Sequence, residues 1–374
     1  MNILWLAWKD FSHPKRGGAE VVLQELTTRQ AAESHTVTLL TAKHPGSQTT
    51  ETLPNGVHVI RIGGNRYTHP LLALLYYLRH LRGTFDVVIE TVNTAPYFSL
   101  LFLGKAKGIA LYHQLAREIW HYETKPPVSF LGYYIMEPLA TWLLGRSKAQ
   151  LVTVSESTKR DLAKFGWDTT KAYIISEGIC VTPLTDLKNA AKWSRPTMLS
   201  FGAVRAMKRT LDQVKAFEVA KQQVPDLQLK IAGDVSGDYG RTVLDYIAKS
   251  PYHADITCLG RVTEQQKIDL MRRSHIITVT SVKEGWGLIV TEAASQGTPA
   301  VVYDVDGLRD SVIDSQTGII TRTTPKALAA GIVTLLGNPN AYRTLQYDGW
   351  EWSKRITFDQ SYKDLKRVLK EANA

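Results

Sequence analysis

Short apolar runs alternate with longer helix-compatible segments along the chain, and this alternation constrains the fold more than any other feature. Runs 35–41 and 85–91 are rich in β-branched residues, the run 2–8 is apolar after Asn2, and all three predict buried strands. The alternation stops once, in a proline-containing segment without apolar periodicity, and then restarts. The pattern predicts an α/β protein with two Rossmann-like domains facing across an interdomain cleft. The expected parts are an N-terminal domain at 1–180, a linker at 181–196 and a second domain at 197–349.

Composition restricts the class of protein. The 374 residues are 44% hydrophobic and 21% charged, which is ordinary for a globular protein. The two cysteines, Cys180 and Cys258, are too few for a disulfide framework and lack metal-ligand spacing, so we expect a cytoplasmic location. The apolar start at 1–6 is too short for a signal peptide. No apolar run reaches the roughly 18 residues of a membrane span.

The net charge of +10 is spread over the chain without a basic tail. Such a balance favours anionic ligands or an anionic membrane surface over nucleic acid. Two regions bear on membrane contact. The apolar segment 71–82 fits either a membrane-surface patch or a core-packed helix with a cationic end. The aromatic-rich segment 112–142 fits an acceptor site, lipid contact or plain packing.

Two glutamates, Glu284 and Glu292, flank a glycine-containing stretch that follows an apolar strand and leads into a helix. The backbone amides of Gly285 to Leu288 would face an incoming anion at the positive end of that helix. Glu292 would lie in the second turn, where its carboxylate can accept two hydrogen bonds from a vicinal diol. Amides for phosphate and carboxylates for hydroxyls together suit a sugar nucleotide.

The spacing of Glu284 and Glu292 resembles the E-x7-E element of the GT-B retaining glycosyltransferases of family 4. Gly17 and Gly18 open a G-G-A-E turn that also resembles this family, and His113 matches its strand-end histidine. The resemblance covers nearly the whole chain. It implies the GT-B fold and a nucleotide-diphosphate-sugar donor, UDP- or GDP-linked, held mainly by the second domain.

The resemblance also implies roles for individual residues. Glu292 would bind the ribose hydroxyls, Glu284 would lie near the sugar, and Lys208 would neutralise the diphosphate. A final helix, 350–374, would cross back to the first domain. The expected catalytic residues are His113, Arg205, Lys208 and Glu284. The expected donor-binding residues are Gly17, Gly18, Arg205, Lys208, Arg261, Val262, Glu284, Gly285, Trp286, Gly287, Leu288 and Glu292.

Two positions depart from the family pattern. Ala203 stands where the family usually has an arginine, and Arg205, two residues on, is expected to supply the lost charge. Glu177 stands in place of the usual asparagine before Gly178, which puts no catalytic role in doubt.

The resemblance implies transfer with retention of anomeric configuration, by front-face attack in which the donor phosphate takes the acceptor proton. No metal or other cofactor is expected, because cationic side chains and the helix end already supply positive charge. Asp304 and Asp306 form a D-x-D sequence that we interpret as part of a turn.

The expected acceptor is a sugar or a lipid-linked glycan in cell-envelope or polysaccharide synthesis, with possible peripheral contact to an anionic membrane. Two alternatives stay open. One is a nucleotide-sugar epimerase or hydrolase on the same fold. The other is a non-catalytic partner subunit that binds sugar nucleotides.

Overall fold

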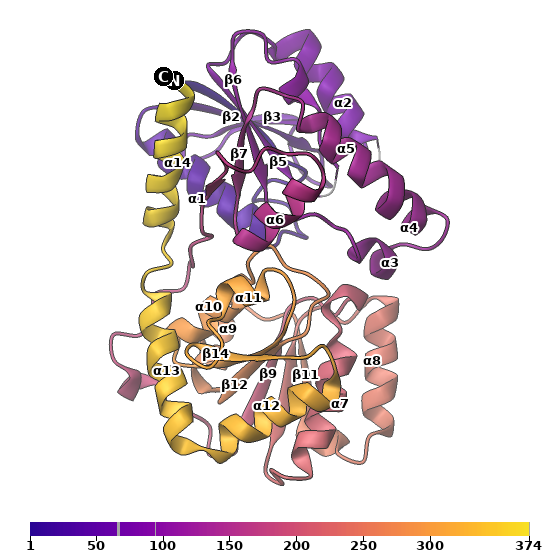
Figure 1. Ribbon diagram of the computed structural model, residues 1–374, viewed down its shortest axis with the longest axis vertical. Helices are drawn as coiled ribbons and strands as arrows, with labels where there is room; N and C mark the ends of the chain where they lie inside the picture. Colours follow the sequence, from indigo (N-terminus) through magenta and orange to yellow (C-terminus); the bar gives the residue numbers. More distant parts are fainter. Residues whose placement is uncertain (66–67, 94, 374) are drawn as a thin grey trace. The chain divides into compact units, whose positions relative to one another are not determined.

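Figure 1 shows the computed structural model, which describes residues 1–65, 68–93 and 95–373. The chain divides into two compact units, each built on its own sheet. The first unit comprises Met1–Arg117, Pro127–Gly178 and Phe358–Ala374. The second comprises Glu118–Pro126 and Ile179–Thr357. The predicted α/β class with two parallel-sheet domains is therefore confirmed.

The sheet of the first unit has the order β3-β4-β2-β1-β5-β6-β7-β8. Its neighbours are parallel, except that the short β3 pairs antiparallel with β4 at one edge. The central strand β1 is buried from Ile3 to Leu6, as expected for a parallel strand covered on both faces. The strands are β1 (Asn2–Leu6), β2 (Thr36–Ala42), β3 (Thr50–Thr52), β4 (His58–Ile62), β5 (Val87–Val92), β6 (Lys107–Tyr112), β7 (Gln150–Thr153) and β8 (Tyr173–Ile174).

Helices connect these strands, and one of them has an apolar face that the protein does not cover. Ala73 and Tyr77 are buried, whereas Leu71 and Leu75 are exposed, so 71–82 is core-packed on one face only. The helical segments of this unit are α1 (Gly18–Ala32), α2 (His69–Tyr76), η1 (Tyr77–Leu81), η2 (Ser99–Leu101), α4 (Val128–Leu131), η3 (Gly132–Met136), α5 (Glu137–Leu144), α6 (Glu156–Lys164) and α14 (Phe358–Asn373).

The sheet of the second unit has the order β11-β10-β9-β12-β13-β14, with parallel neighbours. Its strands are β9 (Thr197–Phe201), β10 (Gln228–Ala232), β11 (Ile256–Gly260), β12 (Ile276–Val279), β13 (Ala300–Tyr303) and β14 (Gly318–Thr321). Its helical segments are α3 (Ile119–Glu123), η4 (Leu187–Asn189), η5 (Ala206–Lys208), α7 (Thr210–Lys221), α8 (Asp238–Lys249), η6 (His253–Asp255), α9 (Glu264–Arg273), α10 (Leu288–Ser295), α11 (Leu308–Ser311), α12 (Pro325–Gly337) and α13 (Pro339–Ser353).

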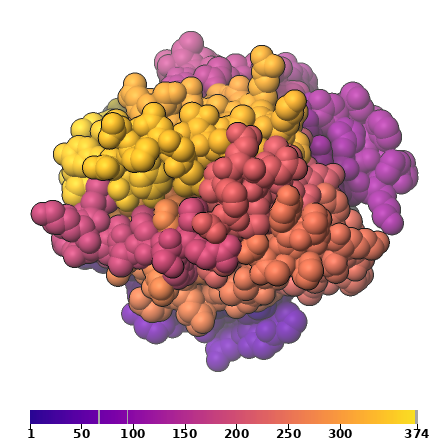
Figure 2. Space-filling view, turned by 90° about the horizontal axis from the view of Figure 1, so that it is seen from below, coloured from indigo at the N-terminus to yellow at the C-terminus, as the bar shows by residue number. Residues whose placement is uncertain are grey.

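The expected linker, 181–196, packs as part of the second unit. Figures 1 and 2 both show it beside the C-terminal helices of that unit, and the indole nitrogen of Trp350 donates to the carbonyl of Leu184 at 2.8 Å. Trp350 is buried in this contact, so the expected crossing segment 350–374 begins too early. The chain re-enters the first unit only at Phe358.

A short piece of the first half of the sequence, Glu118–Pro126, also belongs to the second unit. It contains α3, which packs against η5: the backbone N–H of Met207 donates to Glu123 Oε1 at 3.3 Å. Nothing in the strand–helix alternation indicated this excursion, because it depends on side chains far apart in the sequence.

Candidate functional site

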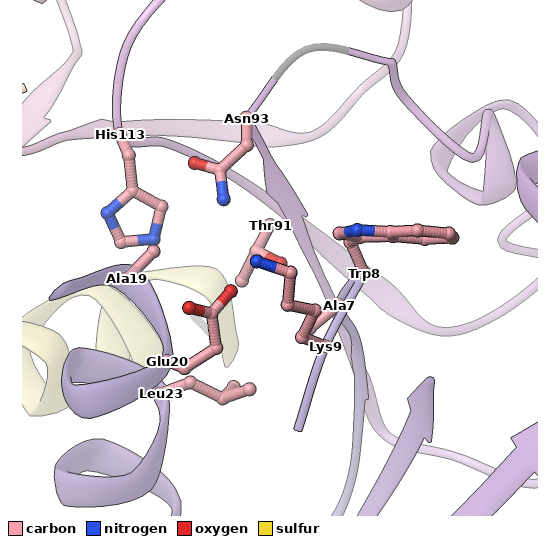
Figure 3. Close-up of a pocket in the computed structure, with 9 residues that line it drawn as sticks. All are labelled: Ala7, Trp8, Lys9, Ala19, Glu20, Leu23, Thr91, Asn93 and His113. Carbon is pink, nitrogen blue, oxygen red and sulfur yellow. The ribbon is translucent and has the colours of Figure 1, made fainter. Parts of the chain in front are cut away.

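A pocket lies at the carboxyl ends of β1, β5 and β6 in the first unit, with an empty volume of about 210 Å³ that includes its open mouth. Ligands in open α/β sheets bind at this end of the strands. Lys9, Glu20 and Asn93 bring polar groups to it, whereas the indole of Trp8, at the edge of the pocket, extends away from them (Figure 3). The lining residues are Ala7, Trp8, Lys9, Ala19, Glu20, Leu23, Thr91, Asn93 and His113.

His113 follows β6 directly and is buried, so the strand end places its ring at the pocket. Its Nδ1 lies 2.6 Å from Oε1 of Glu177, which is also buried. Its backbone carbonyl accepts from the Thr158 hydroxyl at 3.1 Å, which ties the strand end to α6. The carboxylate of Glu177 therefore holds the expected catalytic histidine. Glu177 is also the residue that replaces the family asparagine, a departure from which the sequence alone predicts no effect on catalysis.

Gly17 and Gly18 form the entry to α1, beside the same pocket. The N–H of Gly17 donates to Glu20 Oε2 at 2.5 Å, which closes the first turn of the helix. Both glycines are exposed, so no side chain covers the backbone there. That a ligand approaches the backbone closely at this turn stays a prediction.

The predicted junction after β12 is present in the second unit. Gly287 precedes α10 with φ at +95°, a left-handed conformation suited to glycine. A Cβ at Gly287 would lie 2.9 Å from Leu308 Cδ2, so a larger residue would also clash. Glu292 lies in the second turn of α10, as predicted. Trp286 is buried, while Gly285, Gly287 and Leu288 are partly exposed at the start of the helix.

Lys208 and Glu284 form an ion pair between Nζ and Oε1. Hydrogen bonds to two backbone carbonyls bring the segments together: the Thr280 hydroxyl donates to the Lys208 carbonyl at 2.8 Å, and the Val282 N–H donates to the Met207 carbonyl at 2.8 Å. The structure thus places together two residues that are 76 positions apart in the sequence.

Glu292 pairs with Lys267 of α9 at 3.0 Å, and Lys267 also reaches Glu264 at 2.6 Å. Burial raises the pKa of Glu292, although the charge of Lys267 opposes this shift. The buried Glu292 carboxylate shares its cation, Lys267, with Glu264. A ligand hydroxyl that donates a hydrogen bond to Glu292 would therefore stabilise it.

Arg205 points toward a carboxylate that sequence analysis did not consider. Its guanidinium is half-exposed, lies 3.9 Å from Glu123 Oε2 and contacts Met207 Sδ at 3.1 Å. The neighbouring Arg209 donates to the hydroxyl of Tyr122 at 3.0 Å. Glu118–Pro126 therefore binds the loop that carries the expected diphosphate cations.

Arg261 and Val262 follow β11 directly, and their contact with a donor through the backbone stays a prediction. The Arg261 guanidinium pairs with Asp234 at 2.7 Å. Hydrogen bonds from Ser236 and Arg261 lower the pKa of Asp234. The side chain of Arg261 is thus engaged with a neighbouring loop, while Val262 is partly exposed.

Asp304 and Asp306 make ion pairs with basic side chains. Asp306 binds Lys283 Nζ at 2.5 Å and Arg309 Nη1 at 2.5 Å, and Arg309 Nε also reaches Asp304 at 3.0 Å. Across the residues that the structure describes, no group of three or more His, Cys, Asp or Glu side chains is arranged to hold a metal ion. These contacts fit the interpretation of the D-x-D sequence as part of a turn.

Comparisons with known proteins identify the family of each half of the chain. Residues 185–352 match the family of glycosyl transferases group 1, and residues 16–182 match glycosyltransferase family 4. An uncharacterized glycosyltransferase of Methanocaldococcus jannaschii is 26% identical over 147 residues, which are 39% of this chain and 41% of that protein. The match thus spans less than half of that relative. A phosphatidyl-myo-inositol mannosyltransferase of Mycobacterium tuberculosis is 25% identical over 350 residues, 88% of this chain and 86% of that one.

Solved structures show the same fold. A sucrose-phosphate synthase from Thermosynechococcus elongatus superposes with a TM-score of 0.80 at 17% identity, over 99% of this chain and 98% of that one. The Anabaena protein HepE, solved in complex with UDP and glucose, gives a TM-score of 0.76 at 15% identity, over 99% of this chain and 100% of that one. The two family models together cover most of the chain, so the chain belongs to the glycosyltransferases, with a first half of glycosyltransferase family 4 and a second half of the glycosyl transferases group 1.

Proposed function

We propose that this protein is a retaining hexosyltransferase that moves a sugar from a UDP- or GDP-linked donor to a sugar or lipid-linked acceptor in cell-envelope or polysaccharide synthesis. The observation that carries the proposal is the grouping of Lys208, Glu284 and Glu292 at the carboxyl end of the second sheet. The complex of HepE with UDP and glucose supports a nucleotide-sugar donor.

In this proposal, donor binding breaks the existing ion pairs and replaces them with contacts to the donor. Lys208 leaves Glu284 and binds the diphosphate, and a sugar hydroxyl then donates a hydrogen bond to the Glu284 carboxylate. The ribose diol donates to Glu292, while the amides of Gly287 and Leu288 face the phosphates. As the glycosidic bond breaks, charge grows on the leaving diphosphate, where Lys208 and the helix end stabilise it. No metal ion is required in this scheme.

The pocket of the first unit is proposed to receive a sugar hydroxyl. Asn93 offers both donor and acceptor atoms, and His113 offers a ring nitrogen. The proton of the attacking hydroxyl passes to the donor phosphate on the same face of the sugar, which retains the anomeric configuration.

A screen of nucleotide sugars tests the proposal. The correct donor at about 100 times its Kd should stabilise the protein by about 2.7 kcal/mol in a thermal shift assay. A transferase releases a nucleoside diphosphate when the acceptor is present and transfers the sugar to that acceptor. An epimerised or hydrolysed donor, or binding without turnover, would instead support one of the two alternatives.

We also propose peripheral contact with an anionic membrane, through the segment 128–142. Phe130, Tyr134 and Ile135 expose 52%, 63% and 54% of their surface. The structure shows no helix, in the ranges it describes, that is long and apolar enough to cross a membrane. The charged residue within the segment, Glu137, is buried, and the next one along the chain is the exposed Arg146. An apolar surface with a basic margin suits an anionic interface.

Sedimentation with phosphatidylglycerol vesicles tests this contact. Ile135→Ser should reduce binding, whereas Tyr347→Ser, which removes an equally exposed apolar side chain from α13 (53% against 54%), should not. If both variants lose vesicle binding equally, or if the parent protein does not bind vesicles at low salt, the segment 128–142 is not the membrane contact.

A further inference from the structure

We propose that Glu177 is a positioning residue that fixes the tautomer and orientation of His113, so that Nε2 of the ring accepts a hydrogen bond from a sugar hydroxyl in the pocket. The inference rests on the proposed function for the identity of the ligand. It rests on the structure alone for the pairing of the two residues.

The pairing is short, buried and selective. His113 Nδ1 lies 2.6 Å from Glu177 Oε1, with 5% of His113 and 6% of Glu177 exposed. Within the part of the chain that the structure describes, His113 is the hydrogen-bonding side chain that the Glu177 carboxylate contacts. Burying a carboxylate costs free energy unless it is paired. The contact with His113 is the pairing that offsets this cost for Glu177.

The geometry determines which ring nitrogen meets the ligand. A carboxylate accepts hydrogen bonds only, so in the neutral form of the His113 ring the proton is on Nδ1. Nε2 is then an acceptor, and Figure 3 shows the ring with its second nitrogen directed into the pocket, on the side of Glu20. A hydroxyl is the group of a sugar that can donate to it.

The other charged groups at the pocket have partners of their own. Glu20 Oε2 accepts from the N–H of Gly17 at 2.5 Å, and Lys9 Nζ donates to the carbonyl of Lys15 at 2.8 Å. Neither contact orients the His113 ring. The strand end fixes where the ring begins, and Glu177 fixes which way it faces.

The tautomer is measured directly by ¹⁵N NMR of histidine-labelled protein at alkaline pH, with the His113 signals identified by their loss in His113→Asn. The parent protein should show a proton on Nδ1 and a bare Nε2. Glu177→Leu, which has no acceptor, should give a mixture of tautomers. An unchanged His113 tautomer in Glu177→Leu overturns the inference, whatever reaction the protein catalyses.

Turnover gives a second, independent test. Loss of a carboxylate that orients a metal-bound histidine typically lowers activity by about 10- to 100-fold, and we take this range for the orientation of His113. We expect this loss in kcat/KM for Glu177→Leu, and a smaller loss for Glu177→Gln, whose side-chain oxygen can still accept from Nδ1.

In the His113→Asn background, Glu177→Leu should cause no further loss, because residues that act as a unit are non-additive. A full additional loss in that background would show that Glu177 acts independently of His113. Should Glu177→Leu fail to fold, the same comparison and the NMR measurement are made with Glu177→Gln.

Discussion

The two sheets hold the polar groups at their carboxyl ends in different ways. In the first unit, a buried carboxylate holds His113 at the edge of a formed pocket. In the second, cations and carboxylates hold one another: Lys208 with Glu284, Lys267 with Glu292, and Arg205 with Glu123. The pairs of Lys208 and Arg205 are partly open to solvent, whereas His113 and Glu177 are almost fully enclosed.

This difference indicates how each unit prepares for a ligand. The His113 ring is already oriented, and a ligand has only to reach Nε2. The second unit must exchange its internal ion pairs for contacts with a diphosphate and hydroxyls. Each ion pair keeps a charged group in place in the free protein, so the exchange replaces one set of charge contacts with another. Variants of the second unit should therefore separate binding from turnover.

The largest effect is expected from Lys208→Ala. Charge on the leaving diphosphate grows as the glycosidic bond breaks, so kcat should fall more than the donor KM rises. Removing one preorganised electrostatic group typically lowers the rate by about 10²–10³-fold. Steady-state kinetics measure this, with Lys249→Ala, at the exposed end of α8, as the matched control. A rise in KM at unchanged kcat would assign Lys208 to ground-state binding only.

Arg205→Ala tests whether Arg205 replaces the arginine that is missing at Ala203. If it does, the loss in kcat should approach that of Lys208→Ala, and Ala203→Arg in the same background should restore part of it. The structure sharpens this test, because Arg205 lies beside Glu123 at 3.9 Å. Glu123→Gln should then strengthen donor binding by freeing the guanidinium. Full activity of Arg205→Ala would leave Lys208 and the helix amides as the site's positive charge.

Glu292→Ala should weaken binding of the nucleoside diphosphate by about 10- to 150-fold, since a charged hydrogen bond to a ligand contributes about 1.5–3 kcal/mol. Titration calorimetry measures the change. The fold should persist, because Lys267 keeps Glu264 as a partner. Unchanged affinity would make Glu292 a structural residue.

Although removing the Glu292 carboxylate should weaken ligand binding, it should not lower the stability of the ligand-free protein. Burial raises the pKa of Glu292 above its ordinary value of 4.5, so the folded state binds more protons than the unfolded state above that pH. The contribution of Glu292 to the free energy of unfolding therefore falls as pH rises through this region. Glu292→Gln should melt at least as high as the parent at pH 7, with a smaller difference at pH 4. A lower Tm at pH 7 would contradict this.

The smallest effect is expected from removing divalent metal. Lys208 and the start of α10 supply positive charge, and both carboxylates of the D-x-D sequence are paired with Lys283 and Arg309. Turnover in EDTA should equal that in buffer. Activity lost in EDTA and restored by magnesium or manganese would show that the second unit recruits a metal.

Much of the fold and part of the site could be predicted from the sequence. Parallel strands and their helices leave local periodic patterns, so both sheets and the junction at α10 were foreseen. Partners brought together by the fold leave no such pattern. The contact of Glu123 with the Arg205 loop is one example, and the pairing of Lys267 with Glu292 is another.

The role of Glu177 also could not be predicted from a local pattern. Its departure from the family asparagine was visible in the sequence, but its meaning depended on a histidine 64 positions away. The boundary near Trp350 was misplaced for a related reason. A long helical tail gives no local sign of where it passes from one core to the other, and burial of Trp350 against Leu184 decides that point.

The position of α14 has a consequence for biosynthesis. This helix packs on α1, where Asp359 pairs with Arg29 at 3.0 Å across a separation of 330 residues, and Lys366 pairs with Glu33 at 2.8 Å. Domains usually fold in the order in which the ribosome makes them. Here the first unit is complete only once α14 has been made, after the whole second unit, so a nascent chain stalled before Phe358 would leave the face of α1 that α14 covers exposed to chaperones.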